Sequence, residues 1–180
     1  MQSLLLYTPL ILANMWHAYL VFRIRPQLKD ANSISESALV SKRTLLIHQI
    51  IHSTLGISFI TFAVISINTV GFSYAVGLLI IAAVLDVLQA VILHKDTDHT
   101  PFRLTDTHQA LAWLMTFAYI AFTILYSVEE SVPSIFLYAF ILVLIVGGVY
   151  NYVTKHKHFW VMQMTLFMST TILVFVGGLV

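Results

Sequence analysis

Six long apolar segments, separated by short polar stretches, make up most of the sequence. A helix that crosses a bilayer needs about 20 mostly apolar residues, and lipid offers no partner to unpaired backbone groups, so such segments are expected to be helices. The pattern predicts an all-α polytopic membrane protein, with residues 1–180 forming one transmembrane domain. We expect a six-transmembrane-helix bundle with spans at about 3–22, 44–66, 72–93, 106–126, 134–154 and 159–179.

Basic residues occur only in alternate connections between these segments. Residues 23–43, 94–105 and 155–158 hold all nine Lys and Arg, whereas 67–71 and 127–133 hold none. Cytoplasmic loops of membrane proteins are enriched in Lys and Arg. We therefore expect the basic connections in the cytoplasm, both termini outside (N-out/C-out), and a prokaryotic cytoplasmic (inner) membrane as the location. The first of these connections, the cytoplasmic loop, is the only long one.

Composition agrees with this interpretation and excludes several classes of protein. Hydrophobic residues make up 59% of the chain and charged residues only 9%, whereas soluble domains carry about 25% charged residues. The chain has no cysteine, which excludes disulfides, thiolate metal sites and iron–sulfur clusters. The net charge of +1 gives no indication of nucleic acid, and the partner we expect is the lipid bilayer.

Ionisable side chains inside the predicted helices lie at similar depth. Counted from the nearest basic residue at about 1.5 Å per residue, His17, His48 and His108 lie roughly 7–9 Å inside the cytoplasmic border, and His52 and Asp86 roughly 13 Å. Such groups turn toward each other or toward water, because lipid cannot solvate them. The sequence predicts a buried polar site in the cytoplasmic leaflet.

The remaining histidines fall at the membrane border or in the connections, where an exposed imidazole is ordinary. They are His94, His99, His156 and His158.

His48 and His52 form an H-x-x-x-H pair. Residues four apart share one face of a helix, and two histidines at this spacing can bind one metal ion. Gly56 continues the same face and would let another helix approach closely. The alternative is that both histidines bond to backbone or hydroxyl groups at a packed interface.

An internal similarity links the second and fourth apolar segments. His48 and His108 are each followed by Gln, and eleven residues later by an aromatic–aliphatic run at 59–62 and 119–122. The similarity suggests duplicated hairpins, spans 2–3 and 4–5, related by a pseudo-twofold axis along the membrane normal. In that arrangement His48 and His108 face each other at equal depth.

This geometry favours a centre bound by imidazole. His48 and His108 are candidate axial ligands of haem b, and His17, His48, His52 and His108 are candidate ligands of a divalent metal, namely iron, zinc or copper. Asp86 is the candidate catalytic residue, as a proton acceptor or as a carboxylate that orients a ligand histidine. The alternative for Asp86 is a protonated side chain hydrogen-bonded to Gln or Asn.

Among the possible functions, these residues favour a redox function most. We expect electron transfer or an oxidoreductase reaction with a lipid-soluble partner such as a quinone or a lipid substrate. A zinc-dependent hydrolase would use the same ligands with an activated water. Because imidazole titrates near neutral pH, the first alternative is a transporter or channel that conducts protons or metal ions through the His/Asp cluster. The second is a non-catalytic subunit that assembles with other membrane subunits. The sequence leaves open whether the protein is an enzyme.

The polar loop before the second span contains a possible helix start. Residues 33–36 read Ser-Ile-Ser-Glu, which fits a capping box. The motif predicts that the second helix begins near residue 34 and projects from the membrane, and the alternative is a solvated linker.

Overall fold

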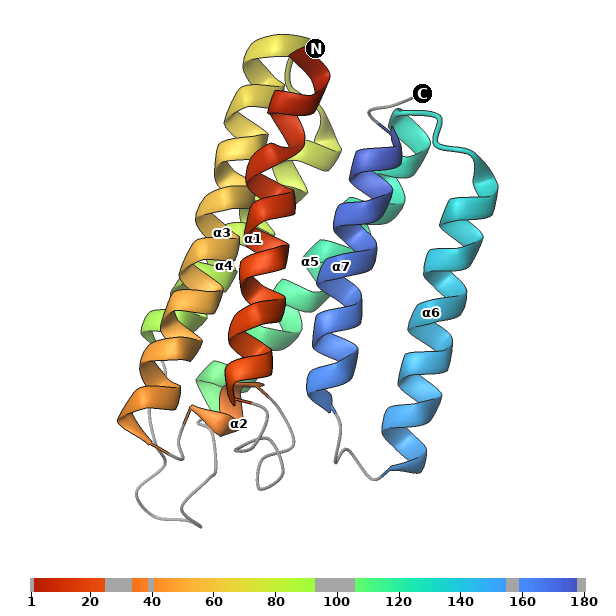
Figure 1. Ribbon diagram of the computed structural model, residues 1–180. Helices are drawn as coiled ribbons and strands as arrows, with labels where there is room; N and C mark the ends of the chain where they lie inside the picture. Colours follow the sequence, from red (N-terminus) through yellow and green to blue (C-terminus); the bar gives the residue numbers. More distant parts are fainter. Residues whose placement is uncertain (1, 25–33, 39–40, 93–105, 155–158, 178–180) are drawn as a thin grey trace.

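The computed structural model describes residues 2–24, 34–38, 41–92, 106–154 and 159–177. These residues form six long helices and one short helix, with no strand among them. The long helices lie side by side as a bundle (Figure 1). In chain order, the helices are α1 (Gln2–Ile24), α2 (Ile34–Ser37), α3 (Lys42–Val70), α4 (Tyr74–Val91), α5 (Asp106–Glu129), α6 (Ser134–Val153) and α7 (Phe159–Gly177).

Five of these helices, α3 to α7, are long and apolar enough to cross a membrane, judged by length and composition over the described residues. Helix α1 is as long as the others but is not one of the five, and it carries Asn14, His17 and Arg23 among its apolar residues. The all-helical prediction is confirmed, and the structure is compatible with a multi-pass membrane protein. The sixth span and the orientation stay predictions.

The predicted spans match the helices to within a few residues, with one difference at the start of α3. Residues 34–37 form the separate short helix α2, so the prediction that the second long helix begins near residue 34 is wrong. The Ser41 hydroxyl accepts a hydrogen bond from the backbone N–H of Thr44 (3.2 Å), and the Thr44 hydroxyl accepts one from the backbone N–H of Ser41 (3.0 Å). This reciprocal capping box makes Lys42 the first residue of α3.

The helices pack in a continuous series. α3 packs along α4, α4 along α5, and α5 against α7, while α1 lies against both α3 and α7. α6 lies at the edge of the bundle and packs mainly against α7 rather than along α5 (Figure 1). The α3–α4 and α5–α6 hairpins therefore pack differently, and their duplication stays a prediction from the sequence.

Gly56 lies at a close approach of α3 to α4. A Cβ atom added to Gly56 would lie 2.6 Å from Val87 Cγ2 and 2.7 Å from the backbone oxygen of Ala83. Both separations are well below van der Waals contact, so the approach requires glycine. The prediction that Gly56 admits a neighbouring helix is confirmed.

A layer of aromatic side chains fills the middle of the core. The Tyr119 ring on α5 lies 5.1 Å from the Phe59 ring on α3 and 5.2 Å from the Phe167 ring on α7, measured between ring centroids. All three side chains are buried. This aromatic layer (Phe59, Tyr119 and Phe167) borders the polar residues described next.

Candidate functional site

Polar side chains from three helices meet in one buried cluster. α3 contributes two histidines, α4 an aspartate and a glutamine, and α5 a histidine and a tyrosine, and each of these six side chains is 0% exposed. Lipid cannot solvate such groups, so they gather inside the bundle as the sequence predicts. The histidine cluster consists of His48, His52, Asp86, Gln89, His108 and Tyr119.

The closest polar contact of the histidine cluster joins His52 to Asp86. His52 Nδ1 lies 2.5 Å from Asp86 Oδ1, with one proton between the two atoms. The Tyr119 hydroxyl donates to Asp86 Oδ2 (3.4 Å). Both carboxylate oxygens thus have a partner, as a buried carboxylate requires. Asp86 thus lies against a histidine, and its catalytic role stays a prediction.

The Gln89 amide lies against both members of this pair. Its Nε2 atom is 2.9 Å from His52 Nδ1 and 3.3 Å from Asp86 Oδ1. It also lies 3.4 Å from the Met115 sulfur. An amide N–H only donates. Gln89 can therefore donate to the carboxylate oxygen, or to the imidazole nitrogen when that nitrogen carries no proton.

His48 connects the cluster to α2. Its ring centroid lies 4.4 Å from that of His52 and 6.0 Å from that of His108. On its other side, His48 Nε2 lies 3.3 Å from the hydroxyl oxygen of the buried Ser35. The one-turn helix α2 thus covers the end of the histidine cluster, at the end of the bundle where α2 lies in Figure 1.

Three imidazole nitrogens remain buried without a hydrogen-bond partner among the described residues. They are His17 Nε2, His48 Nδ1 and His52 Nε2. A buried polar atom without a partner costs roughly 1–3 kcal/mol, and in a native protein it calls for a specific explanation such as a bound water or ion. The cluster therefore has hydrogen-bonding or ligating capacity that its own side chains do not use.

His17 lies at the α1 side of the bundle. Its ring packs edge-on against Phe167 of α7, with 5.5 Å between the ring centroids, and it is buried. The structure thus places His17 next to the aromatic layer, whereas His48, His52 and His108 lie together around Asp86. Its predicted role as a metal ligand stays a prediction.

The predicted ligands are neighbours, but their donor atoms do not converge. Among the described residues, no group of three or more His, Asp or Glu side chains is placed so that it could hold a metal ion. The four border histidines, His94, His99, His156 and His158, lie outside the described residues. A metal or haem at this site thus stays a proposal.

Sequence reasoning missed Ser35 and Tyr119 as members of the site. Tyr119 follows His108 by eleven residues, about three helical turns, so the two share a helix face. This spacing could have identified Tyr119. In the sequence, Ser35 belongs only to a possible helix-capping motif, and no local pattern indicates that it contacts His48.

Comparison with known proteins gives no relative of this chain. It matches no protein-family model, and searches of curated proteins and of solved structures find no match. The function is therefore argued from the residues and their geometry.

Proposed function

We propose that this chain is an integral membrane protein that conducts protons through the histidine cluster. The observation that carries the proposal is the fully buried His52–Asp86 pair, whose Nδ1 and Oδ1 atoms lie 2.5 Å apart. Intramembrane ionisable groups are costly and are typical of proton relays and ion pathways. The two side chains are already in hydrogen-bond contact, so a proton can pass between them without either side chain moving closer.

His52 and Asp86 stay in hydrogen-bond contact in both positions of the shared proton. When His52 Nδ1 holds it, Asp86 Oδ1 accepts from the imidazole and from the Gln89 amide at 3.3 Å. When Asp86 holds the proton, its hydroxyl donates to His52 Nδ1. The proton can therefore move without any side chain changing place, and this supports transfer rather than a static pair.

A line of polar groups leads from the α2 end of the bundle to this pair. Ser35 contacts His48 at 3.3 Å, and the ring of His48 lies 4.4 Å from that of His52. Imidazole carries a nitrogen on each side of its ring, so it can accept a proton at one nitrogen and release a proton from the other. Proton entry is thus proposed from the α2 end through His48 and His52 to Asp86.

The aromatic layer closes the other side of the cluster. Tyr119 lies between Phe59 and Phe167, and the next polar contact along α5 joins the Thr123 and Thr170 hydroxyls at 3.0 Å. Onward transfer requires the rings of the aromatic layer to part. The proposed conduction is therefore slow and gated rather than that of an open pore.

The positions of the helix ends support the predicted topology. α1 begins and α7 ends at the same end of the bundle, opposite α2 (Figure 1). An even number of crossings has this property, which supports six spans. With the basic connections inside, the α2 end faces the cytoplasm of a prokaryotic cell.

The test measures proton flux in sealed proteoliposomes that contain a pH-sensitive dye and are driven by a potassium diffusion potential. The wild-type protein is expected to acidify or alkalise the lumen at least about tenfold faster than empty liposomes. Asp86→Asn keeps the size of the side chain and removes its proton-accepting oxygen, so the flux should fall to the liposome background. A lost proton acceptor typically costs 10²–10⁴-fold in proton-transfer rate.

Glu130→Gln is the matched control, because it makes the same chemical change on an exposed side chain. It should conduct like the wild type. Proton flux that is at background in the wild type, or equal in Asp86→Asn and the wild type, would exclude the proposal.

A metal or haem centre is the second candidate. Asp86 contacts one nitrogen of His52 and leaves Nε2 without a partner, and His48 Nδ1 is likewise buried without one among the described residues. In metal sites, a histidine that binds the metal through one ring nitrogen commonly donates a hydrogen bond from its other ring nitrogen to a carboxylate. His48, His52 and His108 would hold iron, zinc or copper after side-chain rotation. A haem b would use His48 and His108, and the packing of His48 on His52 favours a small ion over a macrocycle.

Elemental analysis and oxidised and reduced absorption spectra of the purified protein test this second candidate. Stoichiometric iron or copper, or a Soret band that shifts on reduction and is lost in His48→Ala and His108→Ala, would replace proton conduction with redox chemistry toward a quinone or lipid. Stoichiometric zinc would replace it with a hydrolase that activates water. A colourless protein without metal would leave proton conduction as the proposed function.

A further inference from the structure

The entrance to the proposed proton path is closed in this structure. His48 is 0% exposed, and Ser35 of α2, which contacts it, is 3% exposed. A proton passes only between groups in hydrogen-bond contact or through an intervening water. Water cannot reach His48 in this arrangement, so proton entry requires the α2 end of the bundle to open.

The short helix α2 covers His48. It packs against α3 and α7 at one end of the bundle (Figure 1). Its Ser35 and the adjoining Ala38 are both buried, and the Ser35 hydroxyl oxygen lies 3.3 Å from His48 Nε2. Displacement of α2 would therefore expose Nε2 of His48 to water.

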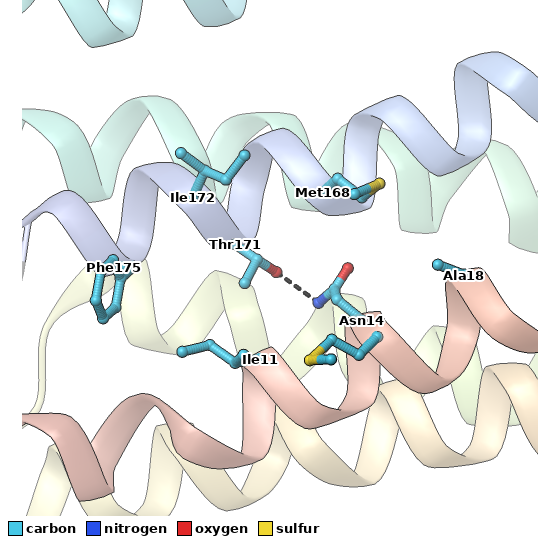
Figure 2. A pocket seen from close by; sticks show the side chains of 8 residues that line it. Ile11, Asn14, Ala18, Met168, Thr171, Ile172 and Phe175 are labelled. Carbon is cyan, nitrogen blue, oxygen red and sulfur yellow. Dashed lines mark hydrogen bonds between the residues drawn. The ribbon is translucent and has the colours of Figure 1, made fainter.

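α2 is held less firmly than the long helices. Its turn is closed by the hydrogen bond from the Ala38 N–H to the Ser35 oxygen (3.2 Å), and an isolated turn of helix is unstable by itself. The 3.3 Å contact with His48 is at the long end of hydrogen bonding. By contrast, α7 is joined to α1 by a hydrogen bond of 2.7 Å from Asn14 to Thr171 (Figure 2). α2 can thus move away while the bundle stays assembled.

A water molecule can replace the hydroxyl of Ser35 at His48. A hydroxyl and a water can each donate and accept a hydrogen bond, so His48 Nε2 keeps a partner in either tautomer when α2 leaves. Opening therefore leaves neither atom of this contact unpaired, which keeps its cost in free energy low.

We propose that α2 is a movable cover that controls the access of water, and so of protons, to His48. Segments with few buried contacts open locally at a small cost in free energy, and elements that control access to functional sites are drawn from them. The inference rests on the proposed function only for what enters. The movement of α2 and the exposure of His48 are measurable without proton flux.

The reactivity of a single cysteine tests whether α2 moves. The chain has no cysteine of its own, and Ser35→Cys replaces one oxygen atom with sulfur. A charged maleimide reaches this buried side chain only while α2 is displaced. With an open state populated at roughly 0.1–10%, Ser35→Cys in the purified full chain should react about 10–1,000 times more slowly than Lys42→Cys, which is exposed at the start of α3. Mass spectrometry measures both rates.

Ser127→Cys is the matched control for burial. It makes the same change at a serine that is also 3% exposed but lies in the long helix α5, and it should not react on this time scale. A rate for Ser35→Cys equal to that for Ser127→Cys would show that α2 is a fixed part of the bundle. A rate equal to that for Lys42→Cys would show that α2 does not cover His48. Either result would overturn the inference.

Labelling also prepares a protein in which α2 cannot close. The maleimide adduct on Ser35→Cys is too large for the buried site, so it should hold α2 away from His48. Diethyl pyrocarbonate, which modifies neutral imidazole, should then modify His48 about 10–1,000 times faster than before labelling, the inverse of the open fraction. Fragment mass spectrometry locates the modification. Labelled Lys42→Cys should show no change at His48.

An unchanged rate at His48 after labelling of Ser35→Cys would overturn the inference, because α2 would then not limit access. Absence of proton flux in the wild-type protein would instead exclude the proposed function, and the labelling rates would still decide whether α2 moves. The two proposals can thus fail separately.

Discussion

Asp86 and His52 depend on one another in a way that single substitutions can expose. Each is buried, and the pair offsets its own desolvation only while both members are present. Tyr119 and Gln89 add contacts at 3.4 and 3.3 Å to the carboxylate, which lie at the long end of hydrogen bonding. The pair should therefore dominate the energetics of the histidine cluster.

Replacing one partner should cost more than replacing both. We expect His52→Leu to lower the free energy of unfolding by about 3–5 kcal/mol, because it leaves the carboxylate buried without its main partner. The double variant His52→Leu/Asp86→Leu should lie closer to the wild type than His52→Leu does. Reversible unfolding in mixed micelles, followed by circular dichroism, measures both. Losses that simply add would show that the two side chains do not act as a pair.

The packing of α3 on α4 determines where these residues meet. Gly56 follows His52 by one turn on the same face, and the backbone oxygen of Ala83 precedes Asp86 by three residues. The close approach at Gly56 brings the imidazole within reach of the carboxylate. A small change in the spacing of α3 and α4 should therefore disturb the site as well as the fold.

Gly56→Ala should destabilise the protein by about 1–3 kcal/mol, since its methyl group overlaps Val87 and the oxygen of Ala83. Gly148→Ala is the matched control on α6. A Cβ there meets nothing within 4 Å, and Ala is favoured over Gly in a helix by about 0.5–1 kcal/mol. Thermal unfolding of both variants in the same detergent compares them. Equal melting temperatures would contradict the close contact.

The bundle as a whole has one end rich in basic residues and one without them. Lys42 and Arg43 lie exposed where α3 begins, and Glu129 and Glu130 lie exposed at the opposite end, where α5 ends. α2 and the entrance to the histidine cluster share the basic end (Figure 1). Orientation in the membrane therefore decides which side of the membrane the α2 end faces, and from which side protons would enter in the proposed conduction.

Single cysteines can report this orientation, because the chain has none of its own. In intact bacterial cells, Glu130→Cys should react with a membrane-impermeant maleimide. Lys42→Cys should react only after the cells are permeabilised. The reverse pattern would place the α2 end outside and contradict the predicted topology, and labelling of neither in permeabilised cells would contradict the exposure of both residues.

The sequence alone determined the long helices and identified His48, His52, Asp86 and His108 of the histidine cluster. Apolar runs of membrane length and the polar stretches between them are local properties, so the helix bounds follow directly. The histidines and Asp86 turn inward because lipid cannot solvate them, and Gly56 marked a close helix contact. None of these inferences requires knowledge of which helices are neighbours.

Only the tertiary structure decided which side chains meet. Ser35 reaches His48, Tyr119 reaches Asp86, and the Asn14 amide donates to the Thr171 hydroxyl. Each depends on helices brought together by packing across the whole bundle, which no local pattern encodes. The same packing joined His52 to Asp86 and, among the described residues, left no group of three His, Asp or Glu side chains placed to hold a metal ion.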